Sequence, residues 1–268
     1  DWSVTGVQTC ALPICIIVDR PRGNVHTMSV MQSLHAAVVE AALSRDIKLI
    51  TLEGAGSHFS YGASIEEHTP DRIGGVLPWL RRLVLAIAGS PVPVAALVQG
   101  ICFGGAFEAV AACHFVFAAP DARMALPEVK LGVFPPAACA LLPRRAGQSL
   151  CDRMVILGEE VTGNQLHTAG FVTRLYPAGE LWKGVEAWYH QTLKSLSASS
   201  LRYATLASRR QLVKELEEQL LEQEQAYSAS GLEDSRRSFV PVPLIETHDA
   251  NEGINAYLGK RPPAWRNQ

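Results

Sequence analysis

The chain has 268 residues, of which 48% are hydrophobic and 19% are charged, and its formal net charge is −2. This length and apolar content allow one large buried core with a smaller appendage. No net basic charge is present to attract nucleic acid or anionic lipid, which argues against a polyanion-binding role. The apolar runs are far shorter than the roughly 20 residues that cross a bilayer, so we expect a soluble, cytoplasmic protein. The six cysteines have no metal-ligand spacing, and no metal site is predicted.

The first residues are expected to be foreign to the protein. Val4 to Ile14 resembles the conceptual translation of a common sequencing adaptor. We therefore assign residues 1–14 to a non-native segment and exclude them from the fold prediction. The alternative is that this stretch forms an authentic first strand and turn.

Strand and helix patterns alternate through the first half of the chain. After the end of a strand at Ile16–Asp19, short apolar runs predict strands at Lys48–Leu52, Val94–Val98 and Phe115–Ala118. Apolar residues at helical spacing, with a glycine turn before the third helix, predict helices at Met28–Leu43, Leu77–Ala88 and Gly104–Ala112. This alternation indicates an α/β core with parallel strands and with active-site residues at the strand-to-helix turns.

The second half of the chain has a helical pattern. Beyond about Leu141 the strand signal nearly vanishes, apart from Phe171–Leu175. Amphipathic stretches at Trp182–Leu196 and Leu201–Tyr227 predict long helices, and the charges from Lys214 to Glu224 fit a solvated helix face. We place an α/β core at residues 15–198 and a C-terminal helical region at residues 199–268.

A glycine turn lies between a predicted strand and a predicted helix. Gly104 and Gly105 permit a tight turn and present N–H groups at the helix start. Those amides, together with the helix dipole, can hold an oxygen atom that becomes negative. We expect Glu108 in the first turn of the helix, beside the same pocket. Phosphate-binding and purely structural turns share this pattern, so alone it is weak evidence.

A second segment contributes another carboxyl group. Glu128 follows Pro127 at a predicted helix start. Two carboxyls in different environments can divide the work, one ionised and one protonated, as addition of water or relocation of a proton requires. Taken singly, each glutamate is explained as well by a carboxylate that stabilises a helix dipole.

A third segment, His58 to Ser64, is a loop shortly after a predicted strand. Gly62 permits an unusual backbone angle, and Ala63 can offer its N–H group. The amides of Ala63 and Gly104 would then form an oxyanion hole with two donors, the kind that stabilises an enolate.

In this order and spacing, the three segments resemble the crotonase (enoyl-CoA hydratase/isomerase) superfamily. They match its oxyanion loop, its G-x-x-x-G-G-x-x-E turn and its P-E-x-x-x-G element. The likeness continues to Gly253–Arg261 and covers nearly everything after Cys15. Three linked motifs are more specific than any one of them and favour a catalytic role for both glutamates.

The resemblance implies an α/β spiral of ββα units with a C-terminal helical trimerisation region, assembled as a homotrimer or homohexamer. It implies an acyl-CoA substrate whose thioester oxygen lies between the amides of Ala63 and Gly104, with Glu108 and Glu128 as acid and base. Coenzyme A is part of that substrate, so no separate cofactor, nucleic acid or membrane partner is expected. The residues expected along the substrate are Arg22, Asn24, Val25, Ser60, Tyr61, Gly62, Ser64, Ile65, His68, Phe103, Gly105, Leu126, Phe134, Pro136 and Lys260.

The chain also departs from the hydratase pattern. Phe134 to Cys139 replaces a glycine-rich P-G-A-G-G run, and Pro136 stands where a glycine would supply an N–H group that proline lacks. Ser64 replaces the common aspartate of the oxyanion loop. With the stretch from Ser60 to Pro70, these departures resemble the branch of cyclohexa-1,5-diene-1-carbonyl-CoA hydratases, which implies a lyase that hydrates a cyclic dienoyl thioester.

Two alternatives stay open. A positional isomerase would use the same oxyanion hole and one glutamate to move a proton without adding water. A non-catalytic scaffold of the same fold would bind a partner or RNA through its trimer surface instead, but such a protein has no chemical need for both glutamates and both glycines. The mass of the product separates hydration from isomerisation.

Overall fold

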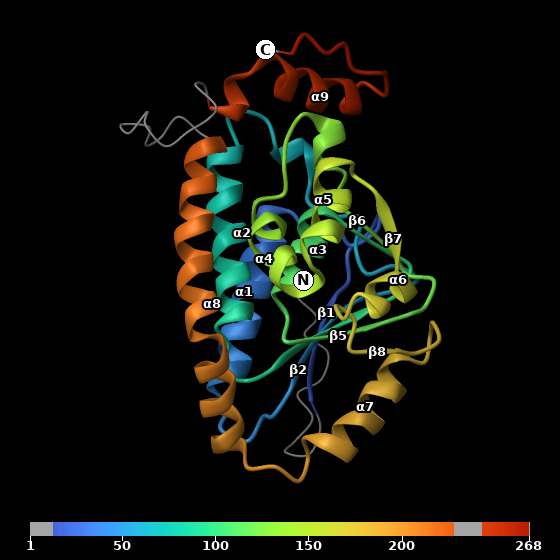
Figure 1. The fold of residues 1–268 in the computed structure, drawn as a ribbon, viewed down its shortest axis with the longest axis vertical. Helices are drawn as coiled ribbons and strands as arrows, with labels where there is room; N and C mark the ends of the chain where they lie inside the picture. Colours follow the sequence, from blue (N-terminus) through green and yellow to red (C-terminus); the bar gives the residue numbers. More distant parts are fainter. Residues whose placement is uncertain (1–12, 228–242, 268) are drawn as a thin grey trace.

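The computed structural model describes residues 13–227 and 243–267. Its centre is a five-stranded parallel sheet with the order β1-β2-β3-β5-β8 (Figure 1). The strands are β1 (Ile14–Val18), β2 (Ile50–Gly54), β3 (Val94–Val98), β5 (Phe115–Ala118) and β8 (Arg174–Leu175). The predicted α/β core with parallel pairing is therefore confirmed.

A smaller sheet lies next to the carboxyl end of β3. It consists of β4 (Ile101–Phe103), β6 (Arg123–Ala125) and β7 (Glu160–Thr162), with β4 parallel and β7 antiparallel to β6. A bridge between Ser60 and Cys102 attaches the loop after β2 to this sheet. Because β4 runs directly into α3, the small sheet fixes where α3 begins.

Helices cover both faces of the large sheet, as parallel sheets require. Alternate side chains of β3 and β5, including Leu97 and Phe117, pack against Val185 and Trp188 of α7 on one face. The remaining side chains of these strands join the larger core on the other face, together with α1, α2 and α3. The helices are α1 (Met28–Leu43), α2 (Ile73–Ala88), α3 (Gly104–Ala112), α4 (Pro136–Ala146), α5 (Gln148–Ile156), α6 (Gly163–Thr168), α7 (Leu181–Thr192), α8 (Ala198–Tyr227) and α9 (His248–Leu258), with short 3-10 helices η1 (Ile65–Glu67), η2 (Pro127–Leu131) and η3 (Leu244–Glu246).

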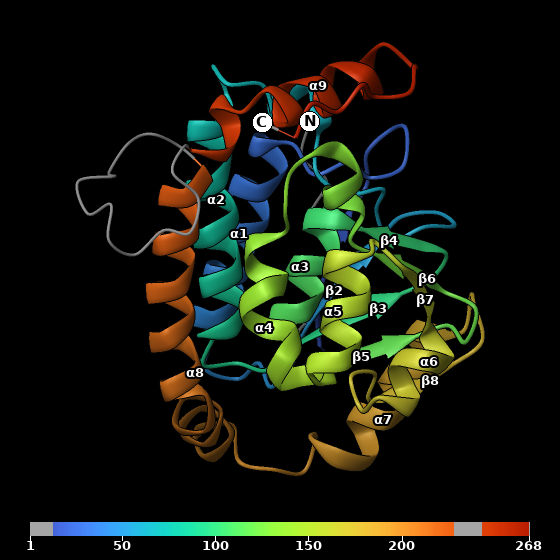
Figure 2. The same cartoon turned by 45° about the horizontal axis from the view of Figure 1, so that its top comes forward.

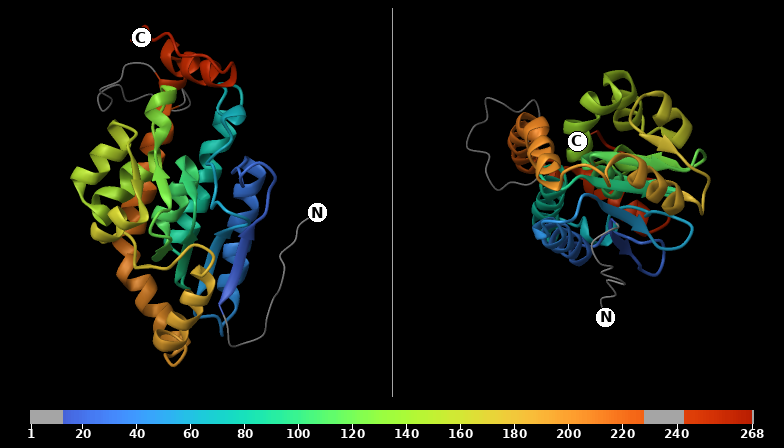
Figure 3. Two further views of the ribbon diagram at one scale, coloured as in Figure 1. Left: turned by 90° about the vertical axis from the view of Figure 1, so that its right-hand side faces the viewer. Right: turned by 90° about the horizontal axis from the view of Figure 1, so that it is seen from below.

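The long helix α8 brings the C-terminal region back to the core. It packs against α2 and α4, and Figure 2 and Figure 3 show it running along the outside of α2. Leu216 and Leu220 are buried in this contact while most of its charged residues are exposed, as predicted for a solvated helix face. The end of α8 therefore reaches the region where η2 and α4 meet.

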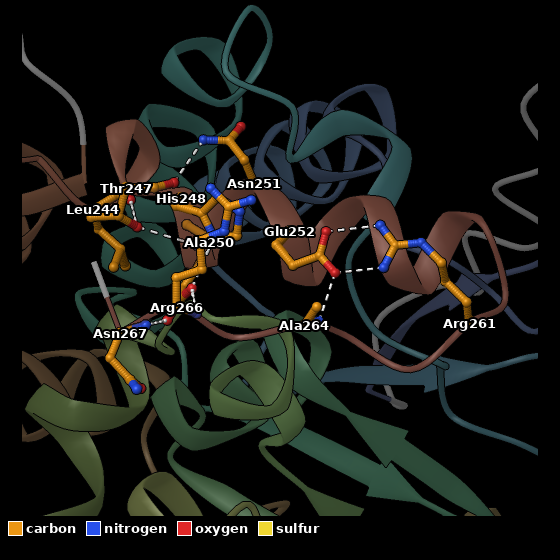
Figure 4. Close-up of polar contacts among 11 residues, drawn as sticks. Leu244, Thr247, His248, Ala250, Asn251, Glu252, Arg261, Ala264, Arg266 and Asn267 are labelled. Carbon is orange, nitrogen blue, oxygen red and sulfur yellow. Dashed lines mark hydrogen bonds and ion pairs between the residues drawn. The ribbon is translucent and has the colours of Figure 1, made fainter.

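The last helix, α9, packs on η2, and the chain after it folds back (Figure 4). The Glu252 carboxylate accepts hydrogen bonds from the Arg261 guanidinium and from the Ala264 amide, and Asp249 accepts from the amides of Arg266 and Asn267. Arg261 is thus held in an ion pair, while its neighbour Lys260 is exposed.

Several predicted elements have the predicted bounds. Met28–Leu43, Val94–Val98, Gly104–Ala112 and Phe115–Ala118 form α1, β3, α3 and β5. The strand expected at Lys48–Leu52 lies two residues later, and the helix expected at Leu77–Ala88 begins at Ile73. Three further expectations were wrong. The strand β7 was not anticipated; only Val161 of its three residues is buried, so it has no periodic signal. In Phe171–Leu175 only the last two residues form β8, because the amides of Phe171 and Val172 donate to the Leu166 carbonyl instead of to a neighbouring strand.

The third correction concerns Glu108, which was expected in the first turn of α3. It is the fifth residue of that helix, and the first turn holds no acidic residue. At about 3.6 residues per turn, Glu108 lies in the second turn. The Glu108 carboxyl group therefore does not cap the first turn of α3, and stabilisation of the helix dipole does not explain its presence.

Residues 1–12 of the expected non-native segment lie outside the described residues, whereas Ile14 begins β1 and pairs with Ile50. The boundaries proposed at residues 14/15 and 198/199 stay predictions. Within the described parts of the chain, no helix is both long enough and apolar enough to span a membrane.

Candidate active site

One pocket brings together the three segments singled out from the sequence. It encloses about 650 Å³, including the space at its mouth, between the starts of α3 and α4, the loop from Tyr61 to His68, η2, α2 and the end of α8. Most of its wall is apolar and comes from Met31, Val76, Leu77, Leu80, Leu131 and Val133. An apolar pocket with a few convergent polar groups is the usual form of a small-molecule site.

The Ala63 amide is presented by a single parallel bridge. The His26 amide donates to the Gly62 carbonyl at 2.8 Å, and the Ser64 amide donates to the His26 carbonyl at 3.1 Å. In such a bridge the N–H of the middle residue points away from the partner strand. No group in the described parts of the chain accepts a hydrogen bond from the Ala63 amide, so this donor is available to a ligand.

The oxyanion loop is pressed against the start of α3. Gly62 adopts a φ of +105°, and a Cβ there would lie 2.8 Å from the Phe103 carbonyl oxygen. A Cβ on Gly105 would lie 3.2 Å from the Ala63 Cβ and 3.9 Å from its nitrogen, while a Cβ on Gly104 would lie 2.9 Å from Glu128 Oε1. Gly105 precedes the intrahelical hydrogen bonds, so its N–H group has no acceptor within α3, whereas the register of β4 with β6 directs the Gly104 N–H group to the Ala125 carbonyl.

The structure thus brings Ala63, Gly104 and both glutamates to one place, as the sequence predicted. It adds a detail that the sequence analysis missed. Gly105, rather than Gly104, is the glycine whose Cα faces Ala63, and Gly104 faces Glu128.

Glu108 is buried, with 2% of its surface exposed, and is held by the start of α4. Its Oε1 accepts hydrogen bonds from the amides of Ala137 at 2.6 Å and Ala138 at 3.1 Å. Burial disfavours the charged form and raises the pKa of Glu108 to about 7, although the two amide hydrogen bonds oppose this shift. The carboxyl group therefore changes charge near neutral pH.

Glu128 has a different environment. It follows Pro127 in η2, and its Oε2 is buried with no hydrogen-bond partner in the described parts of the chain. Burial, and secondly the nearby charge of Glu108, raise the pKa of Glu128 well above its usual range. Because two amides of α4 donate to Glu108, whereas Glu128 has only a hydrogen bond from its own amide, we assign the shared negative charge to Glu108 and the proton to Glu128.

Eleven of the predicted residues line this pocket: Tyr61, Gly62, Ala63, Ile65, His68, Gly104, Gly105, Glu108, Glu128, Phe134 and Pro136. Tyr61 also borders a second hollow that includes Arg22 and Asn24. The other predicted residues line neither space: Val25, Ser60, Ser64, Phe103, Leu126 and Lys260.

Two of the predicted binding residues instead support the loop. The Ser60 hydroxyl donates to the Asn24 carbonyl at 2.7 Å and accepts from the Gly62 amide at 3.0 Å. The Asn24 side-chain amide donates to the carbonyls of Ala55 and His58. These bonds fix the loop that carries Ala63.

Sequence reasoning missed Tyr227, the last residue of α8, which also lines the pocket. Its hydroxyl group is hydrogen-bonded to the backbone of Phe134, 93 positions earlier in the chain. Within α8 the residue fits an ordinary buried helix position, so no local pattern indicates a place in the site.

Comparison with known proteins agrees with this geometry. Residues 13–268 match the family described as Enoyl-CoA hydratase/isomerase. The chain belongs to this family. A cyclohexa-1,5-dienecarbonyl-CoA hydratase from Thauera aromatica is 35% identical over 249 residues, which cover 93% of this chain and 91% of that protein. A 2,3-dehydroadipyl-CoA hydratase from Escherichia coli K12 is 28% identical, covering 91% of this chain and 89% of its own.

Solved structures of the enoyl-CoA hydratase/isomerase family share the fold. An enoyl-CoA hydratase from Mycobacterium avium subsp. paratuberculosis K-10 is 27% identical and covers 98% of both chains with a TM-score of 0.80. The predicted family and fold are thus confirmed, and with hydratases among its relatives the chain is a hydratase-like enzyme of the enoyl-CoA hydratase/isomerase family.

Proposed function

We propose that this enzyme adds water to a carbon–carbon double bond conjugated to a coenzyme A thioester. The observation that carries the proposal is a pair of glutamates with buried carboxyl groups, of which only Glu108 is held by amides of another element, in a pocket that also contains backbone donors without acceptors. Carboxyls with unequal proton affinities suit a reaction that needs a base and an acid at the same time.

In the proposed reaction, the thioester oxygen accepts a hydrogen bond from the Ala63 amide and another from the start of α3. Gly104 was the predicted second donor, and the position of Gly105 opposite Ala63 favours the next amide. Donors aimed at an oxygen that becomes negative stabilise the transition state, by about 3 kcal/mol for each donor. As water adds, the electron pair of the carbon–carbon double bond forms a new double bond to the thioester carbon, and the carbonyl π pair moves onto this oxygen as an enolate.

The two carboxyl groups then handle the protons. Ionised Glu108 takes a proton from water, whose oxygen bonds to the electron-poor carbon of the double bond. Protonated Glu128 gives its proton to the enolate carbon, which restores the thioester carbonyl. One water is consumed, and the two glutamates together lose no proton.

We further propose that the acyl group is a compact cyclic diene. Support comes from the relative of that activity at 35% identity and from the chain's own departures at the pocket. Pro136 has no N–H group to hold the attacking water, and the rings of Phe134 and Tyr227 lie 4.7 Å apart in the wall. Flat aromatic walls suit a ring better than a flexible chain.

The remaining features of the proposal concern coenzyme A and assembly. The hollow that Tyr61 shares with the pocket, with exposed Arg22 at its edge, would take the polar part of coenzyme A. Acyl-CoA brings its own carrier group, and no other cofactor enters the reaction. We also propose a homotrimer or homohexamer in the cytoplasm, where the five described cysteines would stay reduced as they are here.

A panel of unsaturated acyl-CoAs, including the cyclic dienoyl thioester, tests the function. We expect the wild type to form a product heavier by one water, and Glu108→Gln and Glu128→Gln each to lower kcat/KM about 10²- to 10⁴-fold, the usual contribution of a general acid or base. A product of unchanged mass would favour the isomerase instead. Turnover that neither substitution alters would rule out both enzymes.

A further inference from the structure

Tyr227 forms two hydrogen bonds to a single residue of the pocket wall. It is 2% exposed, its hydroxyl oxygen accepts from the Phe134 amide at 3.0 Å, and its hydroxyl proton is donated to the Phe134 carbonyl. The two rings are also stacked at a tilt of 32°. One hydroxyl group therefore satisfies both backbone polar groups of Phe134.

The chain after Phe134 has few other anchors. Pro135 and Pro136 have no N–H group, so Phe134 supplies the one backbone donor between residues 134 and 136. The Pro135 carbonyl accepts from Cys139 within the start of α4. In the described parts of the chain, no other group bonds the Phe134 backbone.

This segment leads directly to the two amides that hold Glu108. Ala137 and Ala138 follow the prolines and donate to Glu108 Oε1. Proline fixes φ near −65°, so the two prolines leave little rotational freedom between Phe134 and these amides. A shift of Phe134 is therefore passed on to the donors of Glu108.

We propose that Tyr227 is a positioning residue: its hydroxyl group fixes the Phe134–Pro136 segment and so keeps the amides of Ala137 and Ala138 on Glu108. The effect on turnover rests on the proposed function. The effect on the Glu108 carboxyl group does not, and it can be measured in the free enzyme.

The charges around Glu108 give the direction of that effect. The titratable groups that face it are Glu128 from η2, Cys139 from α4, Tyr227 from α8 and His68 from the loop after η1. None of them stabilises a negative charge, because burial lowers the pKa of His68 and keeps its imidazole neutral. The two α4 amides are therefore what favours ionised Glu108. Loss of the hydrogen bonds from these two amides would raise the pKa of Glu108 further.

Titration of the Glu108 carboxyl carbon by ¹³C NMR, in protein labelled at glutamate, measures this directly. The Glu108 signal is assigned by its loss in Glu108→Gln. In Tyr227→Phe, which keeps the ring and loses only the hydroxyl group, we expect the pKa of Glu108 to rise by about half a pH unit or more. Tyr203→Phe is the matched control, because Tyr203 is 79% exposed on the same helix, and there the Glu108 pKa should not change.

A second variant separates the hydrogen bonds from the ring packing. Phe134→Leu removes the stacked ring but keeps the backbone groups that Tyr227 binds, so the Glu108 pKa should stay close to that of the wild type. For turnover we expect Tyr227→Phe to lower kcat about tenfold with little change in KM, because a small misplacement of a catalytic group is costly. Its pH profile should shift in the same direction as the NMR titration.

An unchanged Glu108 titration in folded Tyr227→Phe would overturn the inference, whatever the activity. A shift equal to that of Phe134→Leu would also overturn it, since packing alone would then be responsible. If the wild type hydrates no acyl-CoA while the titration moves as expected, the proposed function fails and the positioning role of Tyr227 stands.

Discussion

At the scale of single residues, the site depends on a difference between two identical side chains. The carboxyl groups of Glu108 and Glu128 are both buried beside one pocket, and desolvation raises the pKa of each. Glu108 receives hydrogen bonds from two amides of α4, those of Ala137 and Ala138, whereas Glu128 has only one from its own amide. Such donors favour the ionised form, so the two carboxyls hold different charges at the same pH.

The raised pKa predicts how stability depends on pH. The pKa of Glu108 is about 7 in the folded protein against 4.5 as the ordinary value, so the folded state binds more protons between these limits and stability falls as pH rises through them. Glu108→Gln has no charge to bury. We expect it to be more stable than the wild type by about 1–3 kcal/mol at pH 8 and to show little gain at pH 4.5.

Thermal unfolding at the two pH values measures this difference. Glu252→Gln is the control, because the pKa of Glu252 is shifted in the opposite direction: hydrogen bonds from Arg261 and Ala264 lower it to about 2. Removing the Glu252 charge should therefore not stabilise the protein at pH 8. A stability difference between Glu108→Gln and the wild type that is the same at both pH values would contradict the assignment.

At the scale of elements, the site is made by turns that only glycine allows. Gly62 has a φ of +105° and lies close to the Phe103 carbonyl, so the Ala63 loop sits against the first residues of α3. The sequence indicated these glycine turns because the conformational freedom of glycine is a local property. The sequence did not show that Gly105, rather than Gly104, is opposite Ala63. Neighbouring residues of a turn point in different directions, and those directions depend on the folded backbone.

Gly62→Ala tests this close approach. The added methyl group would lie 2.8 Å from the Phe103 carbonyl oxygen, so the loop must move away from α3 and take the Ala63 amide with it. We expect a loss of stability of about 2–4 kcal/mol, from a positive φ and overpacking together, and at least a tenfold fall in kcat.

Gly170→Ala is the matched control, because Gly170 also has a positive φ, of +80°, but no atom lies within 4 Å of the added Cβ. It should lose only about 1–2 kcal/mol and keep its activity. Equal effects of the two substitutions on kcat would mean that the contact between the loop and α3 does not matter for catalysis.

At the scale of the whole molecule, the site is assembled from segments that are far apart in the chain. The start of α3, the Ala63 loop and η2 carry local motifs, so the sequence predicted that they converge. Tyr227 reaches Phe134 across 93 positions through the packing of α8 on α2 and α4, and no local pattern encodes that contact. The C-terminal helical region thus completes the pocket wall, beyond the trimerisation role that resemblance implied.

A crystal structure with a bound, unreactive acyl-CoA tests the central claim most directly. The account predicts the thioester oxygen at about 2.7–3.1 Å from the Ala63 amide and from an amide at the start of α3, with Glu108 and Glu128 facing the adjoining carbons. A thioester oxygen that contacts neither amide, or an acyl group bound away from both carboxyls, would contradict it.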